Sequence, residues 1–201
     1  MKPVYTVKTM ERIDWSAVPA AELLHTGWLA ENEVRAAAQV CRMGEDLYVR
    51  LEAKEQPIRA TVTSPIEPVC MDSCLEFFLA PWAEDNRYFN FEFNPLGTLN
   101  LGFGGERASR VRQVVKNPEE VFRPRPFETE EGWGIEFRIP ADFLRIYNPK
   151  ASLAEEFGGN FYKCGDLTEE PHYLAWAPLQ SETPDYHRPQ DFGILRLESE
   201  Q

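Results

Sequence analysis

The chain has 201 residues, a formal net charge of −12, and a content of 43% hydrophobic and 12% aromatic residues. The acidic balance excludes a nucleic-acid backbone and an anionic membrane surface as partners, because both require clustered Lys and Arg. The apolar content excludes global disorder, so neutral polar ligands or cations remain the favoured partners of a folded protein.

Location follows from the distribution of apolar residues. No apolar run approaches the roughly 20 residues that span a bilayer, so no membrane partner is expected. The N-terminus has no apolar signal-peptide core. We therefore expect a cytoplasmic protein, or a secreted one if a leader has been removed.

Four cysteines are present, and most of them lie in strand-like runs. Cys70 and Cys74 have the spacing C-x3-C, but no second pair follows, so the sequence predicts no zinc site. Buried free thiols are the expectation for Cys41, Cys70, Cys74 and Cys164, consistent with a reducing compartment.

The first third of the chain contains a predicted β-hairpin. Residues 36–41 and 47–53 predict two strands, the second of which alternates between apolar and polar side chains, and a turn around Gly44 separates them. Residues 4–7 predict a short edge strand. Residues 55–71 contain three prolines and predict a loop at the edge of the domain.

The central stretch, residues 72–103, has the clearest period of two. Residues 74–79 and 88–94 each predict a strand with two unlike faces. In the second strand the three Phe side chains form an apolar wall, and the opposite side carries amides, a carboxylate and a tyrosine. Residues 94–97 predict a turn, and residues 98–103 predict the returning strand.

The remaining elements are also short strands. Residues 111–115, 121–127, 159–166, 173–177 and 192–197 are strand candidates, and residues 132–139 alternate well with Trp133 inward. A short helical turn is predicted at residues 140–144, because Pro140 suits a first helical position. Residues 178–188 predict a loop.

About ten short strands with one or two short helical turns predict an all-β fold. We expect one antiparallel β-sandwich of two sheets, resembling a jelly roll, over residues 1–201 as a single domain. If the two central strands pair, four polar side chains gather on one sheet face, namely Glu76, Asn90, Glu92 and Asn94. This row is a candidate binding surface, and the alternative is an ordinary solvated face.

The order of motifs resembles the carbohydrate-binding module family 9-like domains, within the wider group of DOMON-like β-sandwiches. The similar segments are AAAQVCRMGEDLYVRLEAKE, MDSCLEFFLAP, YFNFEFNPLGTL, GWGIEFRIP, GNFYKCGD, HYLAWAPL and DYHRPQDFGILRL. Together they span nearly the whole chain. The resemblance implies a sugar-binding jelly-roll sandwich of the kind attached to xylanases and other glycoside hydrolases, with a role in carbohydrate catabolism.

The resemblance also implies a site in which two tryptophans grip a saccharide end. Trp176 matches one of them, but residues 68–72 hold no aromatic side chain where the other is expected. Trp82 or Tyr186 is then a candidate for the second wall. Family members often hold structural calcium, so a calcium ion is expected from the resemblance alone.

The side chains of the candidate site suit saccharides. An aromatic ring covers the apolar face of a sugar, and Asn, Glu and Arg bond its hydroxyl groups. Tyr162 and the loop residues Tyr186, His187 and Arg188 join the candidate ligand-binding set. An imidazole and a guanidinium also suit a carboxylate, whereas the alternative for this loop is simple solvation.

Three classes of function remain open. The favoured class is a non-catalytic, lectin-like domain that binds a monosaccharide or an oligosaccharide, with no catalytic residues and no metal ligands assigned. A protein-interaction or assembly module of the same fold is the alternative. A glycoside hydrolase that uses Glu76 and Glu92 as paired carboxylates is less favoured, because no dry pocket is evident from the sequence.

Overall fold

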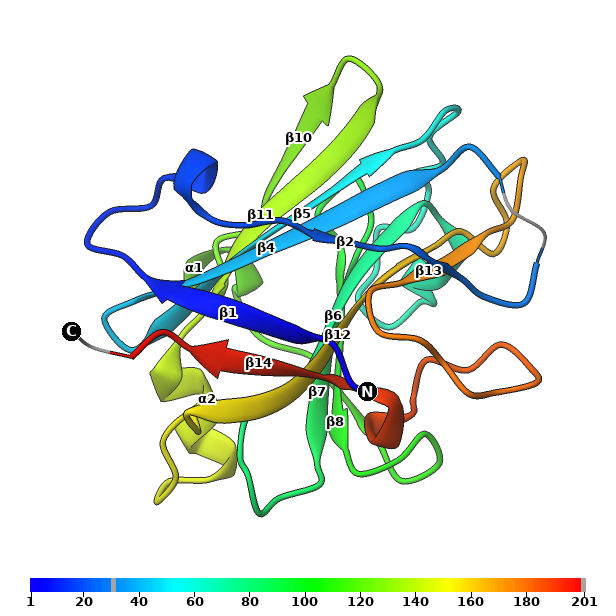
Figure 1. Cartoon of the computed structure of the whole chain (residues 1–201). Coiled ribbons are helices and arrows are strands. Elements are labelled where there is room, and N and C mark those ends of the chain that lie inside the picture. The colour runs from blue at the N-terminus through cyan, green and yellow to red at the C-terminus, as the bar shows by residue number, and fades with distance from the viewer. Residues whose placement is uncertain (30–31, 200–201) are drawn as a thin grey trace.

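The computed structural model describes residues 1–29 and 32–199, which form a curled, mixed sheet of 14 strands folded into two layers (Figure 1). The strands are β1 (Val4–Thr9), β2 (Ala21–Glu22), β3 (His25–Thr26), β4 (Arg35–Met43), β5 (Asp46–Lys54), β6 (Cys74–Ala80), β7 (Tyr88–Phe93), β8 (Leu99–Gly104), β9 (Val111–Gln113), β10 (Arg125–Thr129), β11 (Gly132–Ile139), β12 (Glu156–Cys164), β13 (Tyr173–Ala175) and β14 (Gly193–Leu197). The helical pieces are η1 (Trp15–Ala17), η2 (Val69–Met71), α1 (Pro118–Val121), α2 (Ala141–Tyr147) and η3 (Pro189–Asp191). The all-β prediction is therefore confirmed.

The two layers cross each other, with β4, β5 and β11 running diagonally over β6, β7 and β8 (Figure 1). The strand order is β10-β11-β5-β4-β1-β14-β12-β6-β7-β8-β9, with β13 beside β12. Among the described residues, no helix is long and apolar enough to cross a bilayer.

Strand β1 joins the layers and corrects one expectation. Val4–Val7 pair in parallel with Ile194–Leu197 of β14, and Lys8 and Thr9 pair in parallel with β4. The sheet is therefore mixed and not purely antiparallel. Residues 4–7 pair with β14 alone, as an edge strand does, and the pairing with β4 begins only at Lys8.

The main core lies between the layers and is rich in aromatic rings. The inward side chains predicted from alternation, Phe89, Phe91 and Phe93, are fully buried. Phe93 meets Phe137 of the facing layer with ring centroids 4.7 Å apart. Each such side chain contributes about 1.5–3 kcal/mol of burial free energy, so this face holds the sandwich together.

The hairpin of β4 and β5 is confirmed and turns at Gly44, whose φ of 61° suits glycine. The strand predicted at residues 121–127 is wrong in its first half. Asn117 adopts a left-handed conformation and Pro118 follows at the first helical position, so α1 forms there. Phe122 then enters the core before β10 begins.

The polar face of β6 and β7 is covered, which overturns the solvated alternative. Glu76 and Glu92 are 2% and 5% exposed, and Asn90 and Asn94 are fully buried. The loop that carries Tyr186 covers this face and encloses a second apolar cluster, distinct from the main core. The row of polar side chains thus lies beneath a loop, which is an arrangement typical of a ligand-binding site.

Candidate functional site

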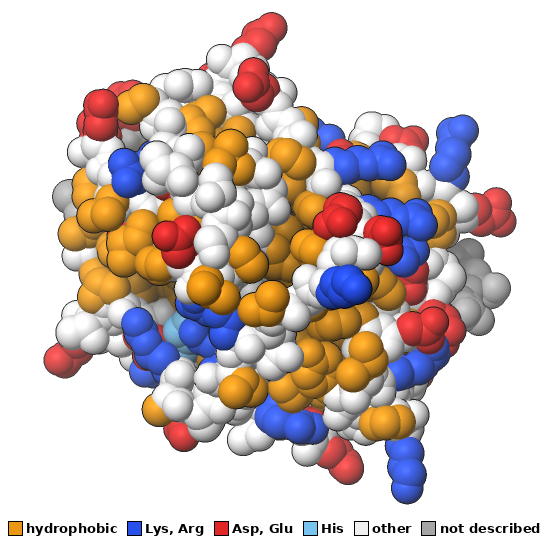
Figure 2. All heavy atoms as spheres, turned by 180° about the vertical axis from the view of Figure 1, so that it is seen from behind, with side chains coloured by type: hydrophobic (Ala, Val, Ile, Leu, Met, Phe, Trp, Pro, Cys, Tyr) orange, Lys and Arg blue, Asp and Glu red, His pale blue; other side chains and the backbone are white. Residues whose placement is uncertain are grey.

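A cavity of about 190 Å³ lies on this covered side of the sheet and is called the outer pocket below. Basic side chains gather near it, and Figure 2 shows Lys and Arg clustered beside a histidine at the left of the view. The lining consists of Trp28, Pro68, Cys70, Glu76, Glu92, Asn100, Arg107, Arg110, Arg112, Cys164, Asp166, Tyr173, Pro184, Asp185, Tyr186 and His187.

Two carboxyl groups form its floor. Glu76 of β6 lies directly opposite Glu92 of β7. Both oxygens of Glu92 accept amide hydrogen bonds, from Asn90 at 2.7 Å and from Asn100 at 2.8 Å. Burial raises the pKa of Glu92, and the Arg110 charge lowers it in part. The pair therefore presents a fixed acceptor at Glu92 beside a carboxyl group on Glu76.

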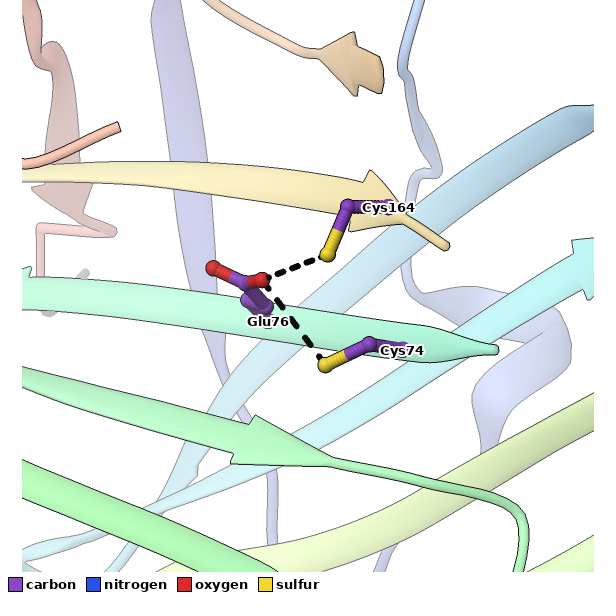
Figure 3. Close-up of side chains that lie close together, drawn as sticks. All are labelled: Cys74, Glu76 and Cys164. Carbon is purple, nitrogen blue, oxygen red and sulfur yellow. Dashed lines mark hydrogen bonds between the residues drawn. The ribbon is translucent and has the colours of Figure 1, made fainter. Parts of the chain in front are cut away.

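Glu76 is the more strongly perturbed member of the pair. Burial and the adjacent Glu92 raise the pKa of Glu76 well above its ordinary value. The thiols of Cys164 and Cys74 lie 3.0 and 3.7 Å from its Oε1 atom (Figure 3). Two thiols and a carboxyl group thus share one small, buried space at the bottom of the pocket.

An aromatic wall stands over the floor. Tyr186 stacks on the buried Tyr162 with ring centroids 4.0 Å apart. Trp28 meets Tyr186 at 5.7 Å and Tyr173 at 5.5 Å, and its Nε1 donates to the Ser181 carbonyl oxygen at 2.7 Å. Both ends of the Trp28 side chain are therefore fixed, and its ring is a rigid wall.

A basic rim faces that wall. Arg107 pairs with Asp185 at 3.1 Å, Arg110 contacts His187, and Arg112 donates to the Ile66 carbonyl oxygen. Burial and the Arg110 charge lower the pKa of His187 to about 3, so its imidazole is neutral at pH 7. The rim can donate hydrogen bonds to a ligand through its guanidinium groups.

The structure brings four of the predicted residues to the pocket, namely Glu76, Glu92, Tyr186 and His187. Asn90 and Tyr162 lie directly behind them, since Asn90 holds Glu92 and Tyr162 supports Tyr186. The pairing of the central strands predicts three of these six residues to lie together, namely Glu76, Asn90 and Glu92.

Four other predicted residues lie outside it. Asn94 is structural, because its side chain bonds Asp72 and the backbone of the β7–β8 turn. Arg188 pairs with Asp191 at 2.6 Å. Trp82 is buried in the main core against Phe89.

Trp176 is the main correction. It packs on the core side of the sheet, against Phe161 at 5.5 Å and Tyr5 at 6.3 Å. Glu76 lies on the other side, so Trp176 is not the platform above the polar row. Trp28 and Tyr173 hold that position instead.

Sequence reasoning missed Trp28, Tyr173, Asn100 and the three rim arginines as pocket residues. Asn100 was detectable, because it alternates with Leu99 and Leu101 along β8 and lies opposite Glu92. The arginines are in and beside the segment between β8 and β9, where no periodicity shows which way a side chain points.

Comparison with known proteins agrees with this fold. The closely similar fold of a candidate carbohydrate-binding protein from Bacteroides uniformis has a TM-score of 0.86 and 24% identity, over 98% of this chain and 100% of that chain. A family 9 module from Caldicellulosiruptor kristjanssonii, solved with cellotriose, has a TM-score of 0.68 and 12% identity, over 99% and 95%. The same module solved with glucose has a TM-score of 0.68 and 13% identity, over 99% of this chain and 97% of that chain.

No curated protein sequence matches the chain. The model of carbohydrate-binding family 9, by contrast, matches residues 6–197. This span runs from β1 to the end of β14, and it agrees with the resemblance found in the order of the motifs. The chain therefore belongs to carbohydrate-binding family 9.

Proposed function

We propose that this protein binds the end of a saccharide in the outer pocket. One observation carries the proposal: carboxyl, amide and guanidinium groups converge on a single cavity beside a fixed tryptophan. Polar groups of this kind bond sugar hydroxyls, and the aromatic ring covers an apolar sugar face. Membership of a carbohydrate-binding family supports the same reading.

The size of the pocket favours a small ligand. A cavity of about 190 Å³ is below the roughly 300 Å³ at which typical small-molecule pockets begin. One terminal sugar ring suits this space, with the rest of a chain outside it. The module from Caldicellulosiruptor kristjanssonii was solved with glucose and with cellotriose, which makes glucose-ended sugars the first ligands to test.

The arrangement of Glu92 favours binding over bond cleavage. Both of its oxygens accept from amide side chains, so the carboxylate is held as a hydrogen-bond acceptor and not left free to attack a sugar. If the pair nevertheless hydrolyses glycosides, new reducing ends appear from polysaccharide and disappear in Glu76→Gln.

Titration calorimetry with glucose, cellobiose and cellotriose tests the binding proposal. We expect a dissociation constant between micromolar and millimolar, equal to about 4–8 kcal/mol. Trp28→Ala removes the wall and should weaken binding by roughly tenfold or more. Trp176→Phe is the matched control, because Trp176 lies on the other side of the sheet, and it should bind like wild type.

Weakened binding in Trp176→Phe together with normal binding in Trp28→Ala would instead identify Trp176 as the aromatic platform of the site. If neither variant matters and no sugar binds to wild type, the saccharide proposal fails. A mass that rises with protein concentration would then favour the assembly alternative, which sedimentation analysis can detect.

A further inference from the structure

Three side chains with metal-binding atoms converge beneath the outer pocket. Cys74 on β6 lies directly opposite Cys164 on β12, and Glu76 follows Cys74 by two residues on the same face. The two sulfur atoms and a carboxylate oxygen all lie within 4.8 Å of one another. Such a cluster is invisible to spacing rules, because Cys164 comes from a strand distant in sequence.

We propose that Cys74, Cys164 and Glu76 bind one thiophilic divalent cation of the Zn²⁺ type, with its fourth coordination position facing the outer pocket. Thiolate ligands select such soft or borderline ions over Ca²⁺ and Mg²⁺, which prefer oxygen. Three protein ligands with one open position is the pattern of zinc sites that also bind a small molecule.

The distances suit a tetrahedral ion. With a Zn–S bond of about 2.3 Å and a Zn–O bond of about 2.0 Å, sulfur and oxygen ligands lie about 3.5 Å apart. Here the sulfur atoms of Cys164 and Cys74 lie 3.0 and 3.7 Å from Oε1 of Glu76. Shifts of about half an ångström therefore bring both sulfur–oxygen distances to the tetrahedral value.

The ligand atoms are already aimed at a common point. Both thiols donate to the same oxygen of Glu76, as the two dashed lines in Figure 3 show. All three side chains are buried, so little conformational freedom is lost when an ion binds. The ion replaces the thiol protons, which leave to solvent as both sulfurs become thiolates.

The pocket supplies a route for the ion. Glu76 and Cys164 line the cavity themselves. Cys70 lines it as well, and its carbonyl oxygen lies 3.9 Å from the Cys164 sulfur. Water or a ligand hydroxyl can therefore occupy the fourth position.

Metal titration of the full, reduced chain tests the proposal without any sugar, so its result is independent of the saccharide proposal. Cd²⁺ is the first probe, because thiolate-to-cadmium charge transfer absorbs in the ultraviolet. We expect one ion per chain, displaced by Zn²⁺. Cys74→Ser and Cys164→Ser should each weaken binding by more than roughly 100-fold, beyond the usual effect of losing an outer-shell partner.

Cys41→Ser is the matched control, because Cys41 is a buried thiol of β4 in the other layer, and it should leave metal binding unchanged. X-ray absorption at the zinc edge on wild type needs no substitution. Two sulfur ligands completed by oxygen ligands are expected. No sulfur or one sulfur, or equal loss in the Cys41 variant, would overturn the proposal.

Discussion

Lys163 is fully buried, which is unusual for an ammonium group. Its Nζ atom lies 3.1 Å from Oε2 of Glu55, 2.7 Å from Nε2 of His172 and 2.8 Å from the Cys164 carbonyl oxygen. Glu55 also accepts from the Trp133 indole at 3.0 Å. This cluster links the residue after β5 with β11 and β12, and therefore both layers of the sandwich.

Glu55→Gln should destabilise the protein by about 3–5 kcal/mol, because it leaves Lys163 buried without an opposite charge. Urea denaturation measures this loss. The double variant Glu55→Gln with Lys163→Met removes both charges and should recover part of the stability. If Glu55→Gln lowers the free energy of unfolding by less than about 1 kcal/mol, another group compensates the buried charge of Lys163.

The pH dependence of stability should report His172. Burial and the Lys163 charge lower the pKa of His172 from 6.5 to about 4. Between these two values the unfolded chain binds a proton at His172 and the folded chain does not, so stability falls as pH decreases through this window. The midpoint of urea denaturation, measured as a function of pH, should therefore fall less in His172→Gln than in wild type. Parallel plots of midpoint against pH for the two proteins would contradict the assignment to His172.

The pocket contains Trp28 where the sequence predicts Trp176, which shows what an alternating pattern can predict and what it cannot. Tyr173 and Ala175 share one face, and Leu174 and Trp176 share the other, as the sequence predicts. Periodicity does not state which face is the core. The packing decides it, because Leu174 and Trp176 belong to the main core between the layers, whereas Ala175 belongs to the second apolar cluster.

At the scale of elements, the strands with strict alternation could be predicted from sequence. β6, β7 and β11 occur where expected, since a period of two survives whenever one face is apolar. α1 could not, because the sequence around Phe122 has the composition of a strand. Its helix depends on the left-handed Asn117 and on packing of Phe122 in the core.

The β7–β8 turn allows a sharp test. Gly97 has a φ of 76°, and its amide donates to the Asn94 carbonyl oxygen at 2.9 Å. Gly97→Ala should cost roughly 1–2 kcal/mol, since a Cβ atom disfavours this conformation. Gly105→Ala is the matched control and should lie within about 0.5 kcal/mol of wild type, because its Cβ would meet only Asn86 at 3.6 Å. Equal thermal shifts in the two variants would contradict the role of the turn.

At the scale of the whole molecule, the β-sandwich could be predicted from sequence, but the pairing of β1 that joins its two layers could not. Hairpins such as β4–β5 can be recognised in a sequence as two strand-like segments separated by a turn. The parallel pairing of β1 with β14 and β4 has no such local signal. Likewise, the outer pocket is assembled from segments far apart in sequence, so sequence reasoning found its strand-borne floor and the loop residues Tyr186 and His187 but not Trp28, Tyr173 or the rim arginines.

The position of β1 also has a consequence for the order of events during synthesis. Val4 finds its partner Ile194 only after synthesis has passed β14. Hairpins can form earlier, but the seam that joins the layers is among the last contacts made, and such non-local pairing slows folding. Until then the seam between the layers stays unpaired, and unpaired strand edges favour aggregation.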